Sequence, residues 1–453
     1  MLTYQLSPES GAPLYEQLYN AIRSDIEEGG LMPGQKLPSK RSFAKNLGVS
    51  VITVEGALDQ LIVEGYLFSK PRSGFFVAKN MRAPKKKLPV TKTKVMMEKE
   101  NWRIDLAKGA NRPDLFPFSR WAKTVREVVS HEPERILLGK LPPQGLPRLR
   151  EAIADYLRGG RGMSVCGEQI IIGAGAQYLY TTLVQLLGRD LVYAIENPGY
   201  PRLNKIYRAD GVIPKFLELD AAGAAVPSAD VDVIHVSPSH QFPTGVVMPI
   251  GRRQQLLNWA GTDKYIIEDD YDWEFRFSGM PIPSLQSIDA FDRVIYLNTF
   301  TQSLGSAVRI AYAVLPESLS IRFAEKLSFF SNSVSALDQL VLAKFLEDGN
   351  FERHVSRLRV AYRSVRDLLI DQLEELGIPV LNTNSGLSFL AKFENPKIAK
   401  ILAKQGIRLP SLASYSLSDA WGRGKHWYYL SFASLTNQLA QEVLDAIKAA
   451  IKS

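Results

Sequence analysis

The sequence predicts an α/β protein of two domains, in which a small helical domain precedes a large domain built on a central, mostly parallel sheet. Three observations lead to this prediction. The chain has 453 residues, more than one hydrophobic core usually organises. From about residue 104 onward, β-rich runs alternate with helical stretches, as in a sheet covered by helices. Most of the formal net charge of +8 lies in one short segment between the two parts.

Composition limits the class of protein. Apolar residues make up 45% of the chain, which is typical of a folded globular protein. Cys166 is the single cysteine, so no intramolecular disulfide can form. No apolar run approaches the roughly 20 residues that span a bilayer, and the first residues lack the pattern of a signal peptide. We therefore expect a cytoplasmic protein without membrane contact. The five histidines show no metal-ligand spacing, so no metal site is expected.

The first domain, residues 1–80, reads as three helices and a hairpin. Apolar residues recur at helical spacing from Leu14 to Ile26, before a pair of glycines. Ser39 is a suitable N-cap for a helix over 40–47, which Gly48 would end, and Ser50 can cap the helix that follows. The stretch YLFSKPRSGFFVA then alternates around a turn at 72–74, as two short strands would. Helix, turn, helix and hairpin together describe a winged helix-turn-helix, which lays its second helix in the major groove.

Positive side chains gather on the parts of this domain that would face DNA. The domain is neutral as a whole, with eight basic and eight acidic residues. Its cations lie near the first helix of the motif and along the hairpin, so we expect operator double-stranded DNA as a partner. The alternative is a small helical domain with ordinary surface lysines. The cations are Lys36, Lys40, Arg41, Lys45, Lys70, Arg72 and Lys79.

Residues 81–103 predict a linker between the domains. They carry eight basic and two acidic residues, with prolines and no apolar period. The segment either serves only as a solvated tether or also touches DNA phosphates.

The large domain, residues 104–453, places polar side chains directly after several predicted strands, which is where parallel sheets bind ligands. Small residues after the strand EQIIIG open a helix whose N–H groups could hold a phosphate. Two carboxylates follow YIIE, and one of them could pair with a protonated ring nitrogen. With a phenol, an aromatic face and two arginines, they suggest a planar, phosphorylated, nitrogen-containing cofactor. The residues are Gly175, Ala176, Gln177, Tyr200, Arg202, Asp269, Asp270, Tyr271 and Arg309.

The first domain resembles the GntR-type DNA-binding domain. The resemblance rests on PLYEQLYNAIRSDI, on GQKLPSKRSFAKNLGVSVITVEGALDQLIVEGYL and on GFFV. Many members have arginine where this chain has Val51, which removes one phosphate or base contact. Together with the charge pattern, the resemblance implies that DNA is contacted by Lys36, Ser39, Lys40, Arg41, Ser50, Thr53, Lys70, Arg72 and Gly74.

The large domain resembles a fold-type I aminotransferase, a class that depends on pyridoxal 5′-phosphate (PLP), with a central sheet and a smaller α/β subdomain. The supporting stretches include IIIGAGAQ, ENPGYPR, SPSHQFPTG, IEDDYDWEFRF and NTFTQSLGSAVRIAYAVLP. The order of GntR domain, linker and aminotransferase-like domain is similar to the MocR/GabR group of transcriptional regulators. This resemblance implies a homodimer that binds DNA and a small-molecule effector.

The same resemblance implies individual roles. Asp269 matches the partner of the pyridine nitrogen, Tyr271 the group at the ring hydroxyl, and Tyr200 the stacking aromatic. Gly175, Ala176, Gln177 and Arg309 match the phosphate site, beside Thr299, Thr301 and Gln302. Arg202 looks like the arginine that receives an effector carboxylate, with His240 and Gln241 in the wall of the site.

Gln302 stands where the family has the lysine that forms a Schiff base with PLP. An amide nitrogen is delocalised into its carbonyl and is not a nucleophile, so transamination by the usual route is not expected, and no residue is assigned as catalytic. Two more departures agree: KLPPQG after residue 139 lacks the expected tyrosine, and Tyr429 stands near the position of a carboxylate-binding arginine.

Three interpretations of this site stay open. It binds PLP or a PLP–amino acid adduct noncovalently; it has been adapted to another ligand or to none; or Gln302 replaces the lysine of a parent protein. The sequence therefore predicts a ligand-responsive transcription factor in which PLP is noncovalent or absent. The alternatives are a PLP-dependent aminotransferase and a regulator whose large domain only dimerises.

Overall fold

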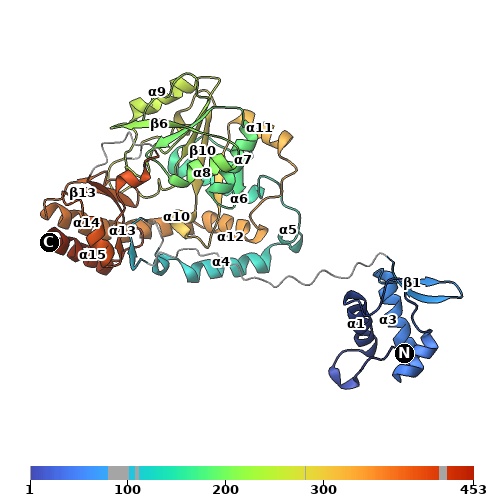
Figure 1. The fold of residues 1–453 in the computed structure, drawn as a ribbon. Helices are drawn as coiled ribbons and strands as arrows, with labels where there is room; N and C mark the ends of the chain where they lie inside the picture. The colour runs from blue at the N-terminus through green and yellow to red at the C-terminus, as the bar shows by residue number, and fades with distance from the viewer. Residues whose placement is uncertain (1, 80–101, 108–111, 281, 418–425, 453) are drawn as a thin grey trace. The chain divides into compact units, whose positions relative to one another are not determined.

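The computed structural model describes residues 2–79, 102–107, 112–280, 282–417 and 426–452. The chain divides into two compact units, Met1–Lys99 and Glu100–Ser453 (Figure 1). Most of the predicted linker, 81–103, lies outside the described residues.

The first unit contains α1 (Leu14–Glu27), α2 (Lys40–Leu47) and α3 (Val51–Val63), followed by the antiparallel strands β1 (Leu67–Lys70) and β2 (Gly74–Val77). The Ser39 Oγ accepts the amide of Ser42, and the Ser50 Oγ accepts the amide of Thr53, so both predicted caps form. Gly48 ends α2 in the left-handed conformation. The apolar faces of all three helices meet in one core around Leu18, Ile22, Phe43, Val54 and Leu58.

The second unit is organised around an eight-stranded sheet with the strand order β4-β11-β10-β9-β8-β5-β6-β7. The pairings β10–β9, β9–β8, β8–β5 and β5–β6 are parallel, whereas β11 is antiparallel to both of its neighbours. The mostly parallel sheet is therefore confirmed. The strands are β4 (Ile170–Gly173), β5 (Tyr193–Asn197), β6 (Lys215–Asp220), β7 (Gly223–Ala224), β8 (Val233–Val236), β9 (Tyr265–Asp269), β10 (Val294–Thr299) and β11 (Ala311–Val314).

Helices cover both faces of this sheet, because alternate residues along each strand point to opposite faces. Ile171, Ile267 and Ile295 enter a core with α7 (Ala176–Leu187), α8 (Pro201–Ala209) and α11 (Glu317–Lys326). Ile170 and Ile172 enter a second core with α6 (Pro147–Arg161), α12 (Ala336–Glu347) and the start of α13 (Asn350–Glu375). On that same face, Ile234 and Ile266 pack against α9 (Ile250–Ala260). Further helices are α4 (Phe118–His131), α5 (Glu134–Leu137) and α10 (Thr301–Leu304).

The C-terminal elements form a smaller α/β subdomain, orange to red in Figure 1. Its antiparallel sheet has the order β12 (Val380–Leu381), β13 (Ser388–Lys392) and β15 (Trp427–Ser431). The core of this subdomain lies between that sheet, α13, α14 (Ile398–Lys404) and α15 (Asn437–Lys452). The strand β14 (Ile407–Arg408) pairs with β3 (Ile104–Asp105), which ties the start of the unit to its end.

In the part of the chain that the structure describes, no single helix is long and apolar enough to cross a membrane. The helices α2 and α3 together have the length and composition of a membrane span, but the pair is bent by 120°. The described residues also contain no group of three or more His, Cys, Asp or Glu side chains placed to hold a metal ion.

Candidate functional site

The predicted DNA-binding residues differ in how free they are to bind. Arg41 on α2 and Arg72 in the hairpin turn are exposed, and neither side chain has a partner within the described part of the chain. Lys40 is half-buried, and its Nζ lies 2.6 Å from the Glu55 carboxylate on α3. The charge of Lys40 is therefore offset within the domain, so Arg41 is more available than Lys40 to contact DNA.

The remaining predicted contacts of this domain hold its local structure. Ser50 and Thr53 are bonded to each other through their hydroxyls, 2.8 Å apart, at the start of α3. Lys36 and Lys70 lie over the ring of Phe76, 5.9 Å and 5.3 Å from its centre. Ser39 caps α2, and Gly74 begins β2 with a φ of 107°, which favours glycine.

In the large unit, the topology of the sheet brings the predicted phosphate residues together. Because β11 runs against β4 and β10, it begins at the edge where those two strands end: Ala311 pairs with Gly173 on one side and with Thr299 on the other. Arg309, just before β11, thus meets Gly175, just after β4. A Cβ on Gly175 would lie 2.9 Å from the Arg309 Nη2, and the φ of Gly175 is 91°.

This edge presents a cation, a helix N-terminus and hydroxyls. Gly175 is the N-cap of the 12-residue helix α7, whose first N–H groups have no partner within the helix. Arg309 is exposed and has no partner within the described residues. The hydroxyls of Thr299 and Thr301 are 3.0 Å apart at the end of β10. Together they can bind an anion.

Gln302 lies on the short helix α10, immediately after these threonines, and its side chain is partly exposed. Its amide has no hydrogen-bond partner within the described part of the chain. The position is thus open to a ligand held at the same edge.

Asp269, at the end of β9, is held by two side chains from other elements. The Tyr180 hydroxyl of α7 donates to its Oδ2 at 2.5 Å, and the His235 Nε2 of β8 lies 3.4 Å from the same atom. Tyr207 in turn bonds the other nitrogen of His235 at 3.0 Å. Burial raises the pKa of Tyr180 well above its usual range, so the phenol keeps its proton and donates. The carboxylate remains partly exposed and can receive a cationic nitrogen.

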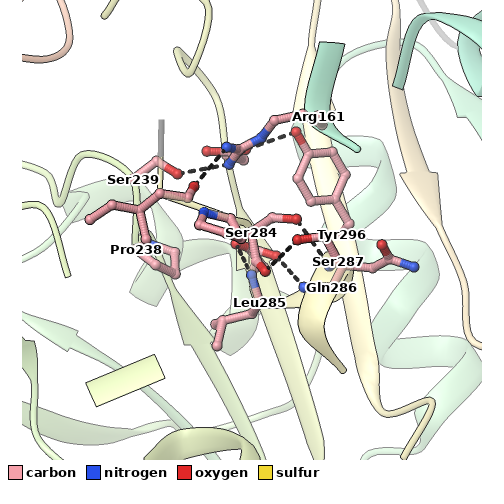
Figure 2. Close-up of polar contacts among 12 residues, drawn as sticks. Arg161, Pro238, Ser239, Ser284, Leu285, Gln286, Ser287 and Tyr296 are labelled. Atoms are coloured by element: carbon pink, nitrogen blue, oxygen red, sulfur yellow. Dashed lines mark hydrogen bonds and ion pairs between the residues drawn. The ribbon is translucent and has the colours of Figure 1, made fainter. Parts of the chain in front are cut away.

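Asp270, the adjacent carboxylate, points into the opposite layer, where its Oδ2 is engaged by side chains of other elements. It forms a buried ion pair with Arg161 of α6 and accepts a hydrogen bond from the Tyr296 hydroxyl at 2.8 Å. Arg161 also donates to the Ser239 hydroxyl at 3.0 Å (Figure 2). Nearby, the Glu268 carboxylate accepts the amides of Leu285 and Gln286. Asp270 is therefore a structural group, and Asp269 alone faces the candidate site.

A cavity of about 330 Å³ lies beside this network, lined by Arg161, Ile282 and Ser287 among others. None of the predicted cofactor residues lines it, so we do not assign it to the cofactor.

Tyr271 is linked to His240 and Asp272. Its hydroxyl donates to the His240 carbonyl at 3.0 Å, and the His240 Nδ1 lies 2.8 Å from the Asp272 carboxylate. The backbone of Gly386 also packs closely against the imidazole ring of His240, because a Cβ at Gly386 would lie 1.9 Å from the His240 Cε1. Burial, followed by the charge of Asp272, raises the pKa of Tyr271 well above its usual range, so its hydroxyl stays protonated.

Gln241 is occupied by the protein itself. Its amide nitrogen donates to Glu196 and to the carbonyls of Pro198 and Phe242, and its oxygen accepts the amide and hydroxyl of Thr244. Any role in binding an effector would act through the loop that Gln241 holds in place.

Tyr200 and Arg202 lie at the start of α8 on the outer side of the site. Tyr200 is 42% exposed and its ring packs edge-on against Phe242, with ring centres 6.0 Å apart. Phe242 also packs against Tyr415 and Tyr429, at 5.1 Å and 5.2 Å. Arg202 is exposed, and its side chain has no partner within the described residues.

Several residues at this site were not predicted from the sequence. Tyr180 of α7 and His235 of β8 bond Asp269, and Glu196 of β5 lies close enough to interact with its charge. A polar residue inside the buried runs VIHV and YAIEN is a signal that could have identified two of them, because a fully covered strand rarely carries an ionisable group without a reason.

Comparisons with known proteins match both the N-terminal domain and the large domain. The model of the bacterial regulatory proteins of the gntR family matches residues 14–77. The aminotransferase class I and II model matches residues 103–447. Among solved structures, a Pyrococcus horikoshii kynurenine aminotransferase has a TM-score of 0.67 at 23% identity, over 78% of this chain and 91% of that one. An archaeal alanine:glyoxylate aminotransferase has a TM-score of 0.66 at 23% identity, over 77% and 90% of the two chains.

Curated relatives that match nearly the whole chain are named as regulators. The uncharacterised HTH-type regulator YdeL of Bacillus subtilis is 36% identical over 97% of each chain. The pyridoxine biosynthesis regulator PdxR of Corynebacterium glutamicum is 33% identical over 93% of this chain and 92% of its own. The probable rhizopine catabolism regulatory protein MocR of Rhizobium meliloti is 30% identical over 98% and 95%. With a GntR-type domain in front of an aminotransferase class I and II domain, the chain belongs to the MocR-type transcriptional regulators of the GntR family.

Proposed function

We propose that this regulator binds operator DNA through residues 1–80 as a homodimer, and that residues 104–453 sense PLP, a PLP–amino acid adduct or a related amine without turning it over. Residues 81–103 would connect the two. The observation that supports the sensor most directly is the meeting of Arg309 with Gly175 at the N-terminus of α7, at the same sheet edge as Asp269.

The residues present fit PLP. The phosphate would be held by a phosphate cradle made of Gly175, Arg309, Thr299 and Thr301. Because Gly175 has no Cβ, Arg309 and the phosphate can approach its backbone closely. Asp269, already oriented by Tyr180 and His235, would pair with the ring nitrogen. Tyr271 would lie against the ring hydroxyl and Tyr200 would cover one face. When bound, PLP supplies an electron-withdrawing ring and an aldehyde that reacts with primary amines.

Gln302 is the reason for proposing binding without turnover. Its amide can donate and accept hydrogen bonds, but it is neither a nucleophile nor a base at neutral pH. The proposal therefore assigns it a contact role beside the ligand. The name of the relative PdxR, which refers to pyridoxine biosynthesis, agrees with a ligand of the vitamin B6 type.

Equilibrium binding of PLP to the purified full chain tests this proposal. We expect reversible binding by calorimetry and absorbance, with no adduct at residue 302 after borohydride. Asp269→Ala should weaken binding about 10- to 100-fold, the loss expected for a charge-assisted hydrogen bond of roughly 1.5–3 kcal/mol. Asp190→Ala, at an exposed position elsewhere, is the matched control. Unchanged affinity in Asp269→Ala would refute the assignment of the ring nitrogen.

Gln302→Lys tests the position itself. The new amine should form a PLP adduct that borohydride fixes and mass spectrometry locates at residue 302. No adduct there, in a variant that still binds PLP, would show that residue 302 does not face the aldehyde. No PLP binding by either protein would overturn the cofactor half of the proposal, whereas amino-donor turnover by the wild type would overturn the sensor role.

A further inference from the structure

The helix α3, the second helix of the helix-turn-helix, begins with two exposed apolar side chains. Val51 is 42% exposed and Ile52 is 79% exposed, directly after the cap residue Ser50. The buried residues of α3 start only at Val54. The tip of this helix therefore presents hydrophobic surface to its surroundings rather than to the core.

Neither side chain is explained by the stability of the domain. Both are β-branched, and such residues are less favourable in helices than straight-chain residues. The exposed surface of Val51 and Ile52 is not buried in the core and so does not stabilise it; the core residues of this helix include Val54, Ala57 and Leu58. The capping bond at this end is made by Ser50 and does not need them.

The polar side chains at this tip are already used. Ser50 bonds the amide and the hydroxyl of Thr53, and Glu55, in the next turn, is paired with Lys40 of α2. Neighbouring elements supply cations that have no partner among the described residues, since Arg41 lies next to Lys40 on α2 and Arg72 lies in the hairpin. Lys40 itself lies over Phe75 of the hairpin, 5.4 Å from the ring centre, so α2, α3 and the hairpin adjoin. An apolar helix tip with cations on the neighbouring elements suits a partner that has a charged backbone and exposes apolar groups between its charges.

In the major groove of DNA, the 5-methyl group of thymine is the apolar group that the base edges offer. We propose that Val51 and Ile52 read thymine methyl groups in the operator, while Arg41 and Arg72 supply contacts to phosphates that do not depend on sequence. The inference rests on the DNA-binding half of the proposed function and is independent of what the large domain binds.

The two contributions separate in an experiment. Full-length protein selects its operator from a pool of random DNA duplexes, and each thymine of that operator is then replaced by uracil, which removes only the methyl group. Removal should weaken binding about fourfold for each methyl that is read, the equivalent of ~0.8 kcal/mol for one buried carbon. In Ile52→Ala this difference should disappear at the thymine that Ile52 contacts, and in Ile52→Val it should persist there.

Val63→Ala is the matched control, because Val63 is 83% exposed on the same helix but lies at its other end. It should keep the full preference for thymine over uracil. Ile52→Ala should leave the dependence of affinity on salt unchanged, whereas Arg41→Ala should make it shallower by about one unit in a log–log plot. Circular dichroism checks that each variant is folded.

Two results would overturn the inference: no thymine whose replacement by uracil weakens binding, or a preference that survives in both Val51→Ala and Ile52→Ala. A pool that yields no operator at all would instead refute DNA binding by this domain, so the two failures are distinguishable.

Discussion

Glu196, at the end of β5, is a buried acid whose ionisation should set part of the pH dependence of stability. Burial raises its pKa from the ordinary 4.5 to about 8, partly offset by hydrogen bonds from Gln241 and the Ser237 amide. Between those two pH values, the folded protein holds a proton that the unfolded chain has lost. The free energy of unfolding therefore falls by about 1.4 kcal/mol per pH unit from this group as the pH rises through that window.

Glu196→Gln should remove this contribution, because the amide is close in shape to the protonated acid and does not ionise. Urea unfolding of the full chain at pH 5, 6, 7 and 8 should show the variant gaining stability over the wild type as the pH rises. Glu218→Gln, which removes a carboxyl from an exposed position on β6, controls for the lost charge. A difference between variant and wild type that stays constant with pH would contradict the account.

At the same scale, the sequence predicts where the candidate side chains lie in the sheet but not which side chains bond them. Asp269 follows a β-rich run, so its place at the edge of the sheet was predictable. The partner that engages Asp270 in the opposite layer is Arg161, which is 109 residues away in the chain. Tyr180 and His235 reach Asp269 from 89 and 34 residues away. Such contacts are fixed by strand order, which local patterns do not encode.

Among the elements, the N-terminus of α7 offers the clearest test of the phosphate cradle. Gly175→Ala would place a methyl group against the Arg309 guanidinium at a φ of 91°, which L-residues rarely adopt. We expect about 1–2 kcal/mol of lost stability and a PLP affinity lowered about tenfold as Arg309 is displaced. Urea unfolding and calorimetry measure the two effects.

Gly159→Ala supplies the opposite expectation. Gly159 lies within α6, and a Cβ there would meet nothing within 4 Å. Alanine should stabilise the protein by roughly 0.5–1 kcal/mol and leave PLP binding unchanged. Equal PLP affinity in Gly175→Ala and Gly159→Ala would show that the cradle does not hold the phosphate.

The elements themselves were largely predictable where local chemistry sets them. Ser39, Gly48 and Ser50 fixed the ends of α2 and α3, because capping acts within three residues. The direction of β11 was not predictable. A strand has the same side-chain alternation whether its neighbours run with it or against it, so RIAYAVLP carried no signal of an antiparallel strand.

For the whole molecule, the proposed sensor and the DNA-binding domain in one chain imply a reciprocal coupling. If PLP changes the operator affinity by some factor, operator DNA must change the PLP affinity by the same factor. We expect a factor of about 5- to 150-fold, measured by anisotropy with labelled operator and by calorimetry with PLP. Asp269→Ala should shift the effect of PLP on DNA binding to about 10- to 100-fold higher PLP concentrations and leave the operator affinity without PLP unchanged. Equal operator affinity with and without saturating PLP would contradict a PLP sensor.

The position of β11 has a consequence for when the site comes into being. In the eight-stranded sheet, β4 is an edge strand whose neighbour is β11, and about 140 residues of chain separate the starts of the two. At synthesis rates of about 5–20 residues per second, β4 waits on the order of 10 s for the strand that fixes it. Gly175 and Arg309 lie beside the ends of these two strands, so the proposed phosphate site is completed late in synthesis, and a nascent chain that stops short of Arg309 lacks its cation.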